Sequence, residues 1–494
     1  MNIAIFNSHN LLASHYETEL EIIINHQNNG DNIVQLVCNK ELPACDNNPY
    51  FHPEACERCV SKRNMGYELL KNKINVKSFF NLTESDKERI AAVPKIFTNV
   101  SDLQKLKVDN YDIGFAISSS VISILRNPNP ELGADLIKRY IISSLGVYFS
   151  MINYLKNNKT DIVYVFNGRL AQTRAVLRAC NLLGIKCLIH ERGNSQNYYS
   201  IFENTSVHDI NNTQRLIKET WEKADSIEKV AVAEKWYLTR IGGKMENWFS
   251  FLEDQIHSLP EGWDPNKINI LICNSSEDEF ASLDEEWKNP FYENQTEGIL
   301  KMVTDGAKYS NVHFYLRIHP NLGKVDNQNV RDLHSLSFKN LTVIPAASKI
   351  STYHLVKNAN KTITFGSTIG AEATYMGKPS LLAGKSFFFD LDAAYVPRNH
   401  EHLMQLIVED LKPKSKEVAL MYGYFFGTFG VKFKHYVPDD FATGTILGAR
   451  LKPYFGLKYK LIKLIYHNKV FSKLSEYLLL RNREKTTNKY LPLK

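Results

Sequence analysis

An imidazole and a pair of hydroxyl groups each follow a short apolar run in the second half of the chain. The motif RIHP closes one run at His319, and the motif TFGST closes another at Ser367 and Thr368. Imidazole and hydroxyl groups donate hydrogen bonds to phosphate oxygens, and so do the backbone N–H groups at the start of a helix. We therefore expect these three residues, on loops from neighbouring strands, to bind a phosphate group.

Four other residues could contribute to the same site. Arg317 would supply positive charge, and Ser275 and Ser276 follow an apolar run in the motif NSSEDE, although the three acids of this motif disfavour a purely anionic ligand. Glu372, one helical turn after the TFGST motif, could accept hydrogen bonds from ribose hydroxyls. The alternative is that the hydroxyls only cap a structural helix and that Glu372 is a solvated surface charge.

A second group of residues suited to chemistry is a cysteine cluster in the first half. Four of the seven cysteines, Cys38, Cys45, Cys56 and Cys59, lie in one turn-rich window that closes with a CxxC pair. Four thiolates are the ligands of a structural zinc site, in which His52 could replace one cysteine. Free, reduced thiols are the alternative. Because four thiolates leave no open coordination position, we expect no catalytic metal here.

The elements that must position these residues alternate between strands and helices. Apolar runs over 268–273 and 312–318 flank a helical pattern over 298–309, and the first half shows the same alternation from an apolar run over 3–6 onward. This alternation predicts parallel sheets covered by helices, with the loops after the strands gathered at one edge. The predicted fold class is α/β, with two Rossmann-like doubly wound domains and a basic helical tail.

The same patterns predict the order of the segments along the chain. We expect a first domain over 1–257 that carries the cysteine-rich insertion at 38–59, and a Pro- and Gly-containing linker over 258–267. The second domain would cover 268–443, and the tail 444–494. Two such domains in succession predict that the second binds one substrate and the first binds the other.

Composition and charge limit the partners. The chain has 494 residues, 44 % of them apolar, and a formal net charge of +7. Twelve Lys and Arg against two Glu fall within 450–494, so the rest of the chain is close to neutral. A charge concentrated at one end indicates an anionic surface as the partner and argues against nucleic acid. The sequence predicts neither a signal peptide nor a membrane-spanning run.

The motif RIHP together with TFGSTIGAEATYMGKPSLL resembles the HP and Ser/Thr motifs of bacterial capsule-type glycosyltransferases with the GT-B fold. This group includes polysialyltransferases, Kdo transferases of capsule synthesis and CDP-glycerol glycerophosphotransferases. In these families the His and the Ser/Thr hold the donor's phosphate, which implies that role for His319, Ser367 and Thr368. The resemblance also implies a nucleotide-sugar donor, with a CMP-sugar favoured, and a catalytic step that requires no metal cofactor.

A glycosyl transfer needs a group that takes the proton of the acceptor hydroxyl. The Asp/Glu-Asp-Gly motif of polysialyltransferases is not evident, so we look to the strand ends of the first domain. There the motif HERG offers Glu191 as the preferred base, with His190 beside it, while His9, His15 and Glu17 compete for the role. The acceptor side would further include Asn167, Arg169 and Arg192. Each could instead be an ordinary polar residue at a strand end.

The tail combines apolar and basic residues at helical spacing. The apolar positions are Leu461, Leu464, Phe471, Leu474 and Leu478, and the basic ones are Lys458, Lys460, Lys463, Lys469 and Lys473. A basic amphipathic helix can bind an anionic membrane surface, although a helix packed across both domains is the alternative. We therefore expect a cytoplasmic protein, peripheral to the inner membrane.

The resemblance, together with the expected phosphate site, implies a glycosyltransferase that moves a sugar from a nucleotide donor to a bacterial surface polysaccharide or a lipid-linked glycan. A glycerophosphotransferase or a nucleotide-sugar epimerase would use the same phosphate-binding residues and is the first alternative. The second alternative is a non-catalytic protein that binds glycans or assists assembly and keeps the fold.

Overall fold

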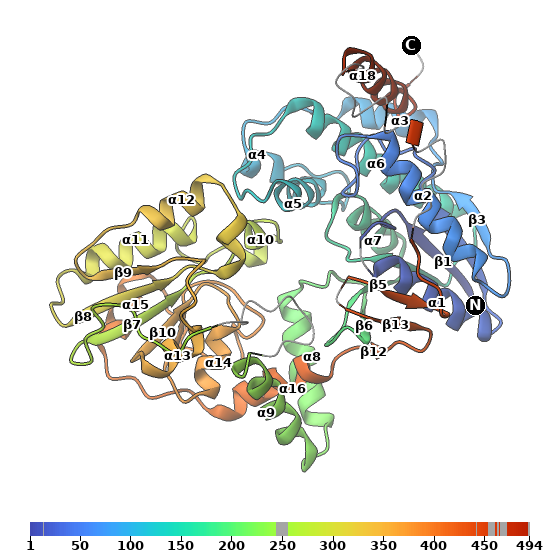
Figure 1. Cartoon of the computed structure of the whole chain (residues 1–494). Helices are drawn as coiled ribbons and strands as arrows, with labels where there is room; N and C mark the ends of the chain where they lie inside the picture. The colour runs from blue at the N-terminus through green and yellow to red at the C-terminus, as the bar shows by residue number, and fades with distance from the viewer. Residues whose placement is uncertain are drawn as a thin grey trace. The chain divides into compact units, whose positions relative to one another are not determined.

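The computed structural model describes residues 1–12, 14–243, 255–440, 442–452, 460–461, 464 and 472–492. The chain forms two compact units (Figure 1). Unit 1 consists of Met1–Ile124, Asn129–Val207 and Gly430–Lys494, and unit 2 of Leu125–Pro128 and His208–Phe429. The chain therefore enters unit 2, completes it, and then returns to unit 1.

Unit 1 is built on a seven-stranded sheet with the order β12-β6-β5-β4-β1-β2-β3. Strands β1 to β5 are parallel, and β6 and β12 join the edge antiparallel. Their bounds are β1 (Asn2–Asn7), β2 (Asn32–Val37), β3 (Asn75–Ser78), β4 (Ile162–Phe166), β5 (Lys186–Arg192), β6 (Tyr198–Glu203) and β12 (Val431–Lys432). The order 3-2-1-4-5 of the parallel strands is that of a doubly wound sheet, in which the strand order reverses between β1 and β4.

Helices cover both faces of this sheet. The helices of unit 1 are α1 (His15–Asn28), α2 (Pro53–Glu68), α3 (Glu84–Ala92), α4 (Val100–Gln104), α5 (Ile113–Leu125), α6 (Ala134–Asn157) and α7 (Ala171–Leu183), and α18 (Ser472–Asn488) lies near the C-terminus. Most of α6 is buried, and α6 packs along α7. Among the helices that the structure describes, none is both long enough and apolar enough to cross a bilayer.

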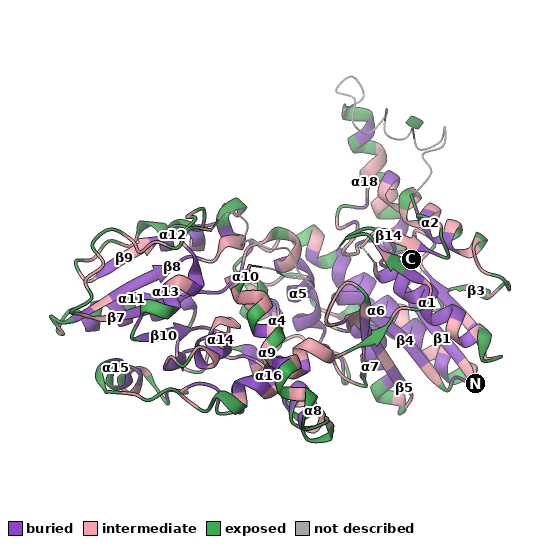
Figure 2. Ribbon diagram, turned by 60° about the horizontal axis from the view of Figure 1, so that its bottom comes forward, coloured by how far each residue is buried: buried purple, intermediate pink, exposed green. Residues whose placement is uncertain are grey.

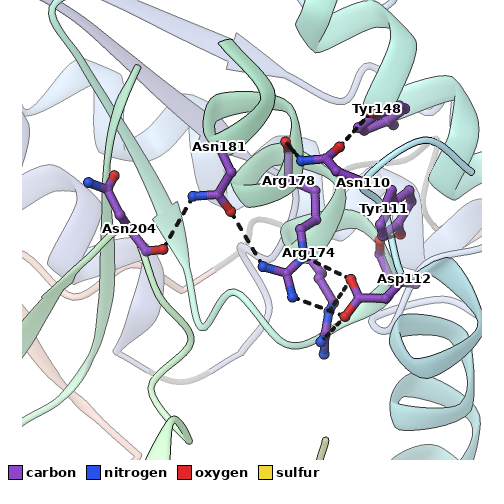
Figure 3. Close-up of polar contacts among 9 residues, drawn as sticks. Asn110, Tyr111, Asp112, Tyr148, Arg174, Arg178, Asn181 and Asn204 are labelled. Carbon is purple, nitrogen blue, oxygen red and sulfur yellow. Dashed lines mark hydrogen bonds and ion pairs between the residues drawn. The ribbon is translucent and has the colours of Figure 1, made fainter. Parts of the chain in front are cut away.

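A partly buried carboxylate fixes α7 to the start of α5 (Figure 3). Asp112 accepts hydrogen bonds from Arg178 at 2.8 and 2.9 Å and from Arg174 Nε at 3.0 Å. Burial opposes ionisation of this carboxyl, but the bonds from Arg178 and the charge of Arg174 outweigh burial and hold its pKa below the usual range. Beside it, Asn110 donates to the carbonyl of Arg178 at 2.9 Å and accepts from Tyr148 at 2.8 Å. Helix α7 is thereby fixed to the segment that precedes α5.

Unit 2 is built on a five-stranded parallel sheet with the order β11-β10-β7-β8-β9. The strands are β7 (Ile268–Cys273), β8 (Val312–Arg317), β9 (Leu341–Ile344), β10 (Lys361–Thr364) and β11 (Ser380–Leu382). Strand β10 is buried along its whole length, as expected where helices cover both faces of a parallel sheet (Figure 2). The order is again 3-2-1-4-5, and it reverses between β7 and β10. The predicted fold class, two Rossmann-like doubly wound units, is confirmed.

The helices of unit 2 complete its core. They are α8 (Ile210–Lys223), α9 (Glu228–Ile241), α10 (Glu277–Ala281), α11 (Gln295–Gly306), α12 (Gln328–Ser335), α13 (Thr352–Asn358), α14 (Ile369–Tyr375), α15 (His400–Val408) and α16 (Lys416–Thr428), with 3-10 turns η1 (Glu285–Trp287) and η2 (Pro320–Lys324). The central core cluster includes Ile270, Ile299, Phe314 and Leu316, all of them fully buried.

The division between the units differs from the predicted one. Helices α8 and α9 lie within the predicted first domain of 1–257, but they pack on α16 and belong to unit 2. Ile217 of α8 shares a core cluster with Tyr422 and Phe425, and the Tyr237 hydroxyl donates to the Ala419 carbonyl at 2.6 Å. An apolar helical face predicts that a helix is buried, but the pattern does not tell which sheet buries it.

The segment after Phe429 returns to unit 1. Strand β12 pairs with β6, and β13 (Tyr436–Pro438) pairs with β14 (Gly444–Ile446) beside α1. Near the C-terminus, Tyr490 is fully buried, and a Cβ on Gly146 would lie 2.1 Å from its ring. The end of the predicted tail therefore packs on unit 1. Residues 453–459, 462–463 and 465–471, which include much of the predicted amphipathic pattern, lie outside the described residues.

Candidate active site

Two buried hydroxyl groups lie at the carboxyl end of β7. The side chains of Ser275 and Ser276 are 4 % and 2 % exposed, and neither Oγ has a hydrogen-bond partner in the described part of the chain. The backbone N–H of Ser275 donates to Gln295 Oε1 at 2.8 Å, which fixes the loop. Buried polar groups are nearly always hydrogen-bonded, so two unpartnered hydroxyls in adjacent positions mark this loop as a candidate ligand site.

The loop after β8 places His319 next to these serines. Its backbone N–H donates to Asn274 Oδ1 at 2.9 Å, which ties the β8 loop to the β7 loop. Its Nδ1 accepts from the Asn321 N–H at 3.1 Å, so the neutral ring carries its proton on Nε2. Burial, followed by the charges of Arg317 and Arg126, lowers the pKa of His319 to about 4. At neutral pH this imidazole is therefore an uncharged donor.

The loop after β10 turns at a position that only glycine can occupy. Gly366 has a φ of 130°, and a Cβ there would lie 2.4 Å from the Phe280 ring and 2.5 Å from the Lys385 carbonyl oxygen. The next two residues carry the predicted hydroxyls. Ser367 Oγ accepts from the Ile369 N–H at 3.3 Å, and Thr368 makes no side-chain cap of α14. The hydroxyls thus stand at the turn itself.

The strand order corrects the predicted arrangement of these loops. We expected His319 and the Ser-Thr pair on neighbouring strands, but β7 lies between β8 and β10. Strands of a sheet are about 4.8 Å apart, so the two outer loops start about 10 Å from each other. Ser275 and Ser276 fill the middle position. The order reverses between β7 and β10, where ligands of doubly wound sheets bind.

Glu372 is not a solvated charge. It is fully buried in α14, and its Oε1 accepts from Arg240 Nε at 2.7 Å. Arg240 also donates from Nη2 to Thr368 Oγ1 at 3.0 Å, and its guanidinium lies over the Trp236 ring at 4.7 Å. One carboxylate oxygen of Glu372 is thus occupied by protein. Arg240 lies on α9, far away in sequence, and no motif marks it as part of this site.

Arg317 has a different task from the predicted one. Its guanidinium donates to the backbone carbonyls of Pro345 at 2.6 Å, Ser348 at 3.0 Å and Ile318 at 3.2 Å. These bonds hold the loop after β9, and the side chain is buried. Its positive charge still contributes to the lowered pKa of His319. We therefore assign Arg317 to the support of the site.

In unit 1, a carboxylate and an amide meet at the carboxyl edge of the sheet. Asn167 Nδ2 donates to Glu191 Oε2 at 2.7 Å, and the Arg192 N–H donates to Oε1 at 3.0 Å. Asn167 lies in the turn after β4 with a positive φ of 60°, and its side chain points toward Glu191. His15 Nε2 lies 3.7 Å from Glu191 Oε1, and the side chain of Glu191 is 22 % exposed. Glu191 is thus both oriented and accessible.

The imidazoles around Glu191 are less accessible. His190 is fully buried, and neither ring nitrogen has a hydrogen-bond partner among the described residues. Burial first, and then the neighbouring His15, lower its pKa to about 3. Burial and the charge of Arg192 likewise lower the pKa of His15, whose ring lies 3.9 Å from that of Phe166. Both rings are therefore neutral at physiological pH.

The other predicted residues of this edge have protein partners. His9 Nδ1 bonds Ser8 Oγ at 2.7 Å, and Nε2 bonds Asp46 Oδ2 at 3.0 Å, so both ring nitrogens are engaged. Arg169 donates to Ser119 Oγ at 2.7 Å. Glu17 pairs with Lys62 at 2.7 Å. Of the bases weighed from the sequence, these bonds leave Glu191 as the accessible one.

The four clustered cysteines are close to the first turns of α2. Asn48 donates to Cys56 Sγ at 3.3 Å, and Asn10 donates to Cys59 Sγ at 3.2 Å. Burial raises the pKa of Cys38 to about 11 and that of Cys56 to about 12, so these thiols are protonated at neutral pH. Within the described ranges, no three or more His, Cys, Asp or Glu side chains are arranged to hold a metal ion. The structural zinc stays a prediction.

No protein-family model matches the chain, and no curated protein matches its sequence. Several solved structures are similar to it. Kdo transferases are among them. KpsC of Thermosulfurimonas dismutans, a beta Kdo 2,4 transferase, matches with a TM-score of 0.36 and 13 % identity over 54 % of this chain and 79 % of its own.

Two further matches cover more of the chain. MnaA of S. aureus, solved with UDP, matches with a TM-score of 0.28 and 12 % identity over 87 % of this chain and 92 % of its own. The spinosyn rhamnosyltransferase SpnG, solved with spinosyn aglycone, has a TM-score of 0.27 and 10 % identity over 87 % of this chain and 97 % of its own. Likeness at this distance identifies neither a substrate nor a reaction, so the function must be argued from the site.

Proposed function

We propose that the protein is a glycosyltransferase that moves a sugar from a nucleotide-sugar donor to a bacterial surface polysaccharide or a lipid-linked glycan. The observation that carries the proposal is the pair of buried serine hydroxyls at the end of β7, without partners in the described part of the chain. A phosphate oxygen would satisfy both. The neutral imidazole of His319 on one side and the hydroxyls of Ser367 and Thr368 on the other extend the same row of donors.

Unit 2 would thus hold the donor by its phosphate groups. His319 donates from Nε2, and the serines and Thr368 donate from their hydroxyls. Negative charge that develops on the leaving phosphate is stabilised by donors already in position. These groups would do so without a metal cofactor. Glu372 would reach a ribose hydroxyl only with Oε2, because Arg240 occupies Oε1.

Glu191 of unit 1 is the proposed general base. Asn167 and the Arg192 N–H hold its two oxygens, and the neighbouring His15 is neutral. A carboxylate held in this way can take the proton of an acceptor hydroxyl as the new bond forms. His190 lies beneath it, fully buried, and would act by supporting the carboxylate's strand.

The acceptor would be presented at the inner membrane, with the C-terminal helix on the lipid surface. In α18, the apolar side chains of Leu474, Tyr477 and Leu480 are 48 %, 58 % and 54 % exposed. Lys473 and Arg481 on the same helix are exposed as well. Exposed apolar residues among basic ones suit an anionic membrane surface, to which each basic residue contributes about 1 kcal/mol.

A thermal-shift panel of CMP, CDP, UDP and GDP tests the proposal. A nucleotide that binds the folded protein raises the melting temperature, and His319→Ala is expected to abolish that rise. His313→Ala is the matched control, because His313 lies at the other end of β8 and bonds Thr342 at 2.9 Å. Absence of any nucleotide effect on the wild-type protein would contradict the proposal and favour a non-catalytic role. Turnover of the donor without an acceptor would favour an epimerase.

A further inference from the structure

A short segment between α5 and α6 belongs to unit 2. Leu125–Pro128 is the only part of the first two hundred residues that is assigned there. Within it, Arg126 has a φ of 50°, a left-handed conformation that is unfavourable for an arginine. Its carbonyl accepts from Asn327 Nδ2 at 2.9 Å, and Asn327 in turn caps α12 by accepting from the Val330 N–H at 2.9 Å. The arginine is therefore held in a strained conformation by the rest of unit 2.

The Arg126 side chain lies against the loop that carries the two unpartnered serines. Its Nε is 2.5 Å from Asp278 Oδ2, and Asp278, two residues after Ser276, is 2 % exposed. The guanidinium keeps a buried nitrogen, Nη2, that has no hydrogen-bond partner among the described residues. The charge of Arg126 also contributes to the lowered pKa of His319. Arg126 is thus a cation beside His319, and its Nη2 group can still donate a hydrogen bond to a ligand.

This arginine changes the charge of the NSSEDE loop. The sequence suggested that its three acids disfavour an anionic ligand, but each acid has a partner in the structure. Asp278 pairs with Arg126, and Glu279 accepts from Asn321 Nδ2 at 2.9 Å. Burial raises the pKa of Glu277 to about 7, so its carboxyl is protonated in about half of the molecules at neutral pH. Arg126 offsets the charge of Asp278 and the raised pKa of Glu277 reduces the charge of that carboxyl, so the loop carries less negative charge than its sequence suggests.

The donors of the site are spread over a width greater than one phosphate group. They follow β10, β7 and β8, and the outer two of these strands are about 10 Å apart. The hydroxyls lie on the β10 and β7 loops, while Arg126 contacts the β7 loop next to His319 of the β8 loop. Two linked phosphates would engage both ends of this row, and a single phosphate would engage one.

We propose that the donor is a nucleoside diphosphate sugar and that Arg126 binds one of its two phosphates, while Asp278 holds the guanidinium in place through Nε. This inference rests on the proposed function, because it presupposes that a nucleotide binds unit 2. A guanidinium fits phosphate oxygens with two parallel N–H donors, which a hydroxyl or an imidazole cannot provide. Asp278 is a positioning residue in this arrangement.

The test is isothermal titration of the full chain with UDP, UMP, CDP, CMP, GDP and GMP at one ionic strength. The wild-type protein should bind one diphosphate at least tenfold more tightly than the monophosphate of the same base. Arg126→Gln should weaken that diphosphate about tenfold or more and leave the monophosphate within about twofold. Arg331→Gln is the matched control, because Arg331 is an exposed arginine of unit 2 paired with Asp326.

The outcomes separate this inference from the proposed function. If the wild-type protein binds nucleotides but Arg126→Gln leaves diphosphate affinity unchanged, or weakens both nucleotides equally, the inference is overturned and the proposed function stands. If no nucleotide binds the wild-type protein, the proposed function itself fails. Because Arg126→Gln leaves a buried carboxylate without its partner, the double variant Arg126→Gln/Asp278→Asn is measured as well. Thermal melting checks that both variants are folded. The double variant is expected to show the same selective loss of diphosphate affinity.

Discussion

Glu191 and His190 show that adjacent residues of one strand can differ completely in their accessibility. They are neighbours on β5, and successive side chains of a strand point to opposite faces. The structure buries His190 completely and leaves Glu191 partly accessible beside Asn167. The motif HERG predicts that polar side chains lie at a strand end, but nothing in it tells which of two adjacent residues faces a ligand.

The first residue-scale prediction concerns the proposed base. Glu191→Gln keeps the size and the contact with Asn167 but cannot take a proton, so turnover is expected to fall by about 10² to 10⁴. Nucleotide affinity should stay unchanged, since the donor phosphates are bound by unit 2. Both are measured with the donor whose nucleotide the thermal-shift panel identifies. Glu203→Gln is the control, because Glu203 forms an exposed ion pair with Lys186; equal losses in the two variants would count against Glu191 as the base.

Arg240 shows why short sequence motifs identify only part of the site. His319, Ser367 and Thr368 can be proposed from short motifs because each directly follows an apolar run. Arg240 reaches Thr368 and Glu372 from 128 and 132 positions away. Contacts over such separations depend on the packing of whole helices, so no local pattern predicts them.

At the scale of elements, the apolar runs predict the strands well because a parallel strand buried on both faces needs an unbroken apolar stretch. Their order is a different matter. Strand β7 pairs with β8, the next strand along the chain, and on its other side with β10, which comes three strands later. This second pairing depends on contacts across the sheet, so no local pattern predicts it. The assignment of α8 and α9 to unit 2 depends likewise on the partner that covers their apolar faces, the helix α16.

Helix α1 carries three buried glutamates, each with a different partner. Glu17 pairs with Lys62, Glu19 accepts from Asn7 at 2.6 Å and Gln35 at 2.9 Å, and Glu21 accepts three backbone N–H groups of residues 434–436. The hydrogen bonds to Glu19 come from neutral side-chain amides. Burial therefore outweighs its hydrogen bonds and raises the pKa of Glu19 to about 8.

An element-scale prediction follows for the pH dependence of stability. Between about pH 4.5 and pH 8 the folded state keeps the proton of Glu19 and the unfolded state has lost it, so stability falls as pH rises through this window. The slope from this one group approaches about 1.4 kcal/mol per pH unit. Glu19→Gln should flatten the decrease in melting temperature between pH 5 and pH 8. Glu84→Gln, at an exposed position on α3, is the control, and an equally steep decrease in Glu19→Gln would rule out this account.

For the molecule as a whole, the distribution of charge predicts membrane attachment. The variant with Leu474, Tyr477 and Leu480 all changed to Gln should bind vesicles of phosphatidylglycerol and phosphatidylcholine about tenfold less well than the wild-type protein. Sedimentation with the vesicles measures binding. Wild-type protein should bind vesicles of phosphatidylcholine alone only weakly, since most of the attraction comes from the basic residues.

The control for this experiment removes a comparable apolar surface elsewhere. Ile227, Val230 and Leu238 lie on or beside α9 and are exposed by 84 %, 39 % and 59 %. Changing all three to Gln should leave vesicle binding intact. If this variant loses binding and the α18 variant keeps it, the attachment surface is not the C-terminal helix.

The return of the chain to unit 1 has a consequence for how the protein is made. The backbone N–H groups that donate to Glu21 belong to residues about 414 positions further along, and β12 closes the edge of a sheet whose first strand begins at Asn2. On the ribosome, unit 2 can therefore complete its core while unit 1 still lacks an edge strand and the partners of a buried carboxylate. The C-terminal segment completes the unit that was begun first, so the nascent unit 1 stays partly assembled while His208–Phe429 is translated.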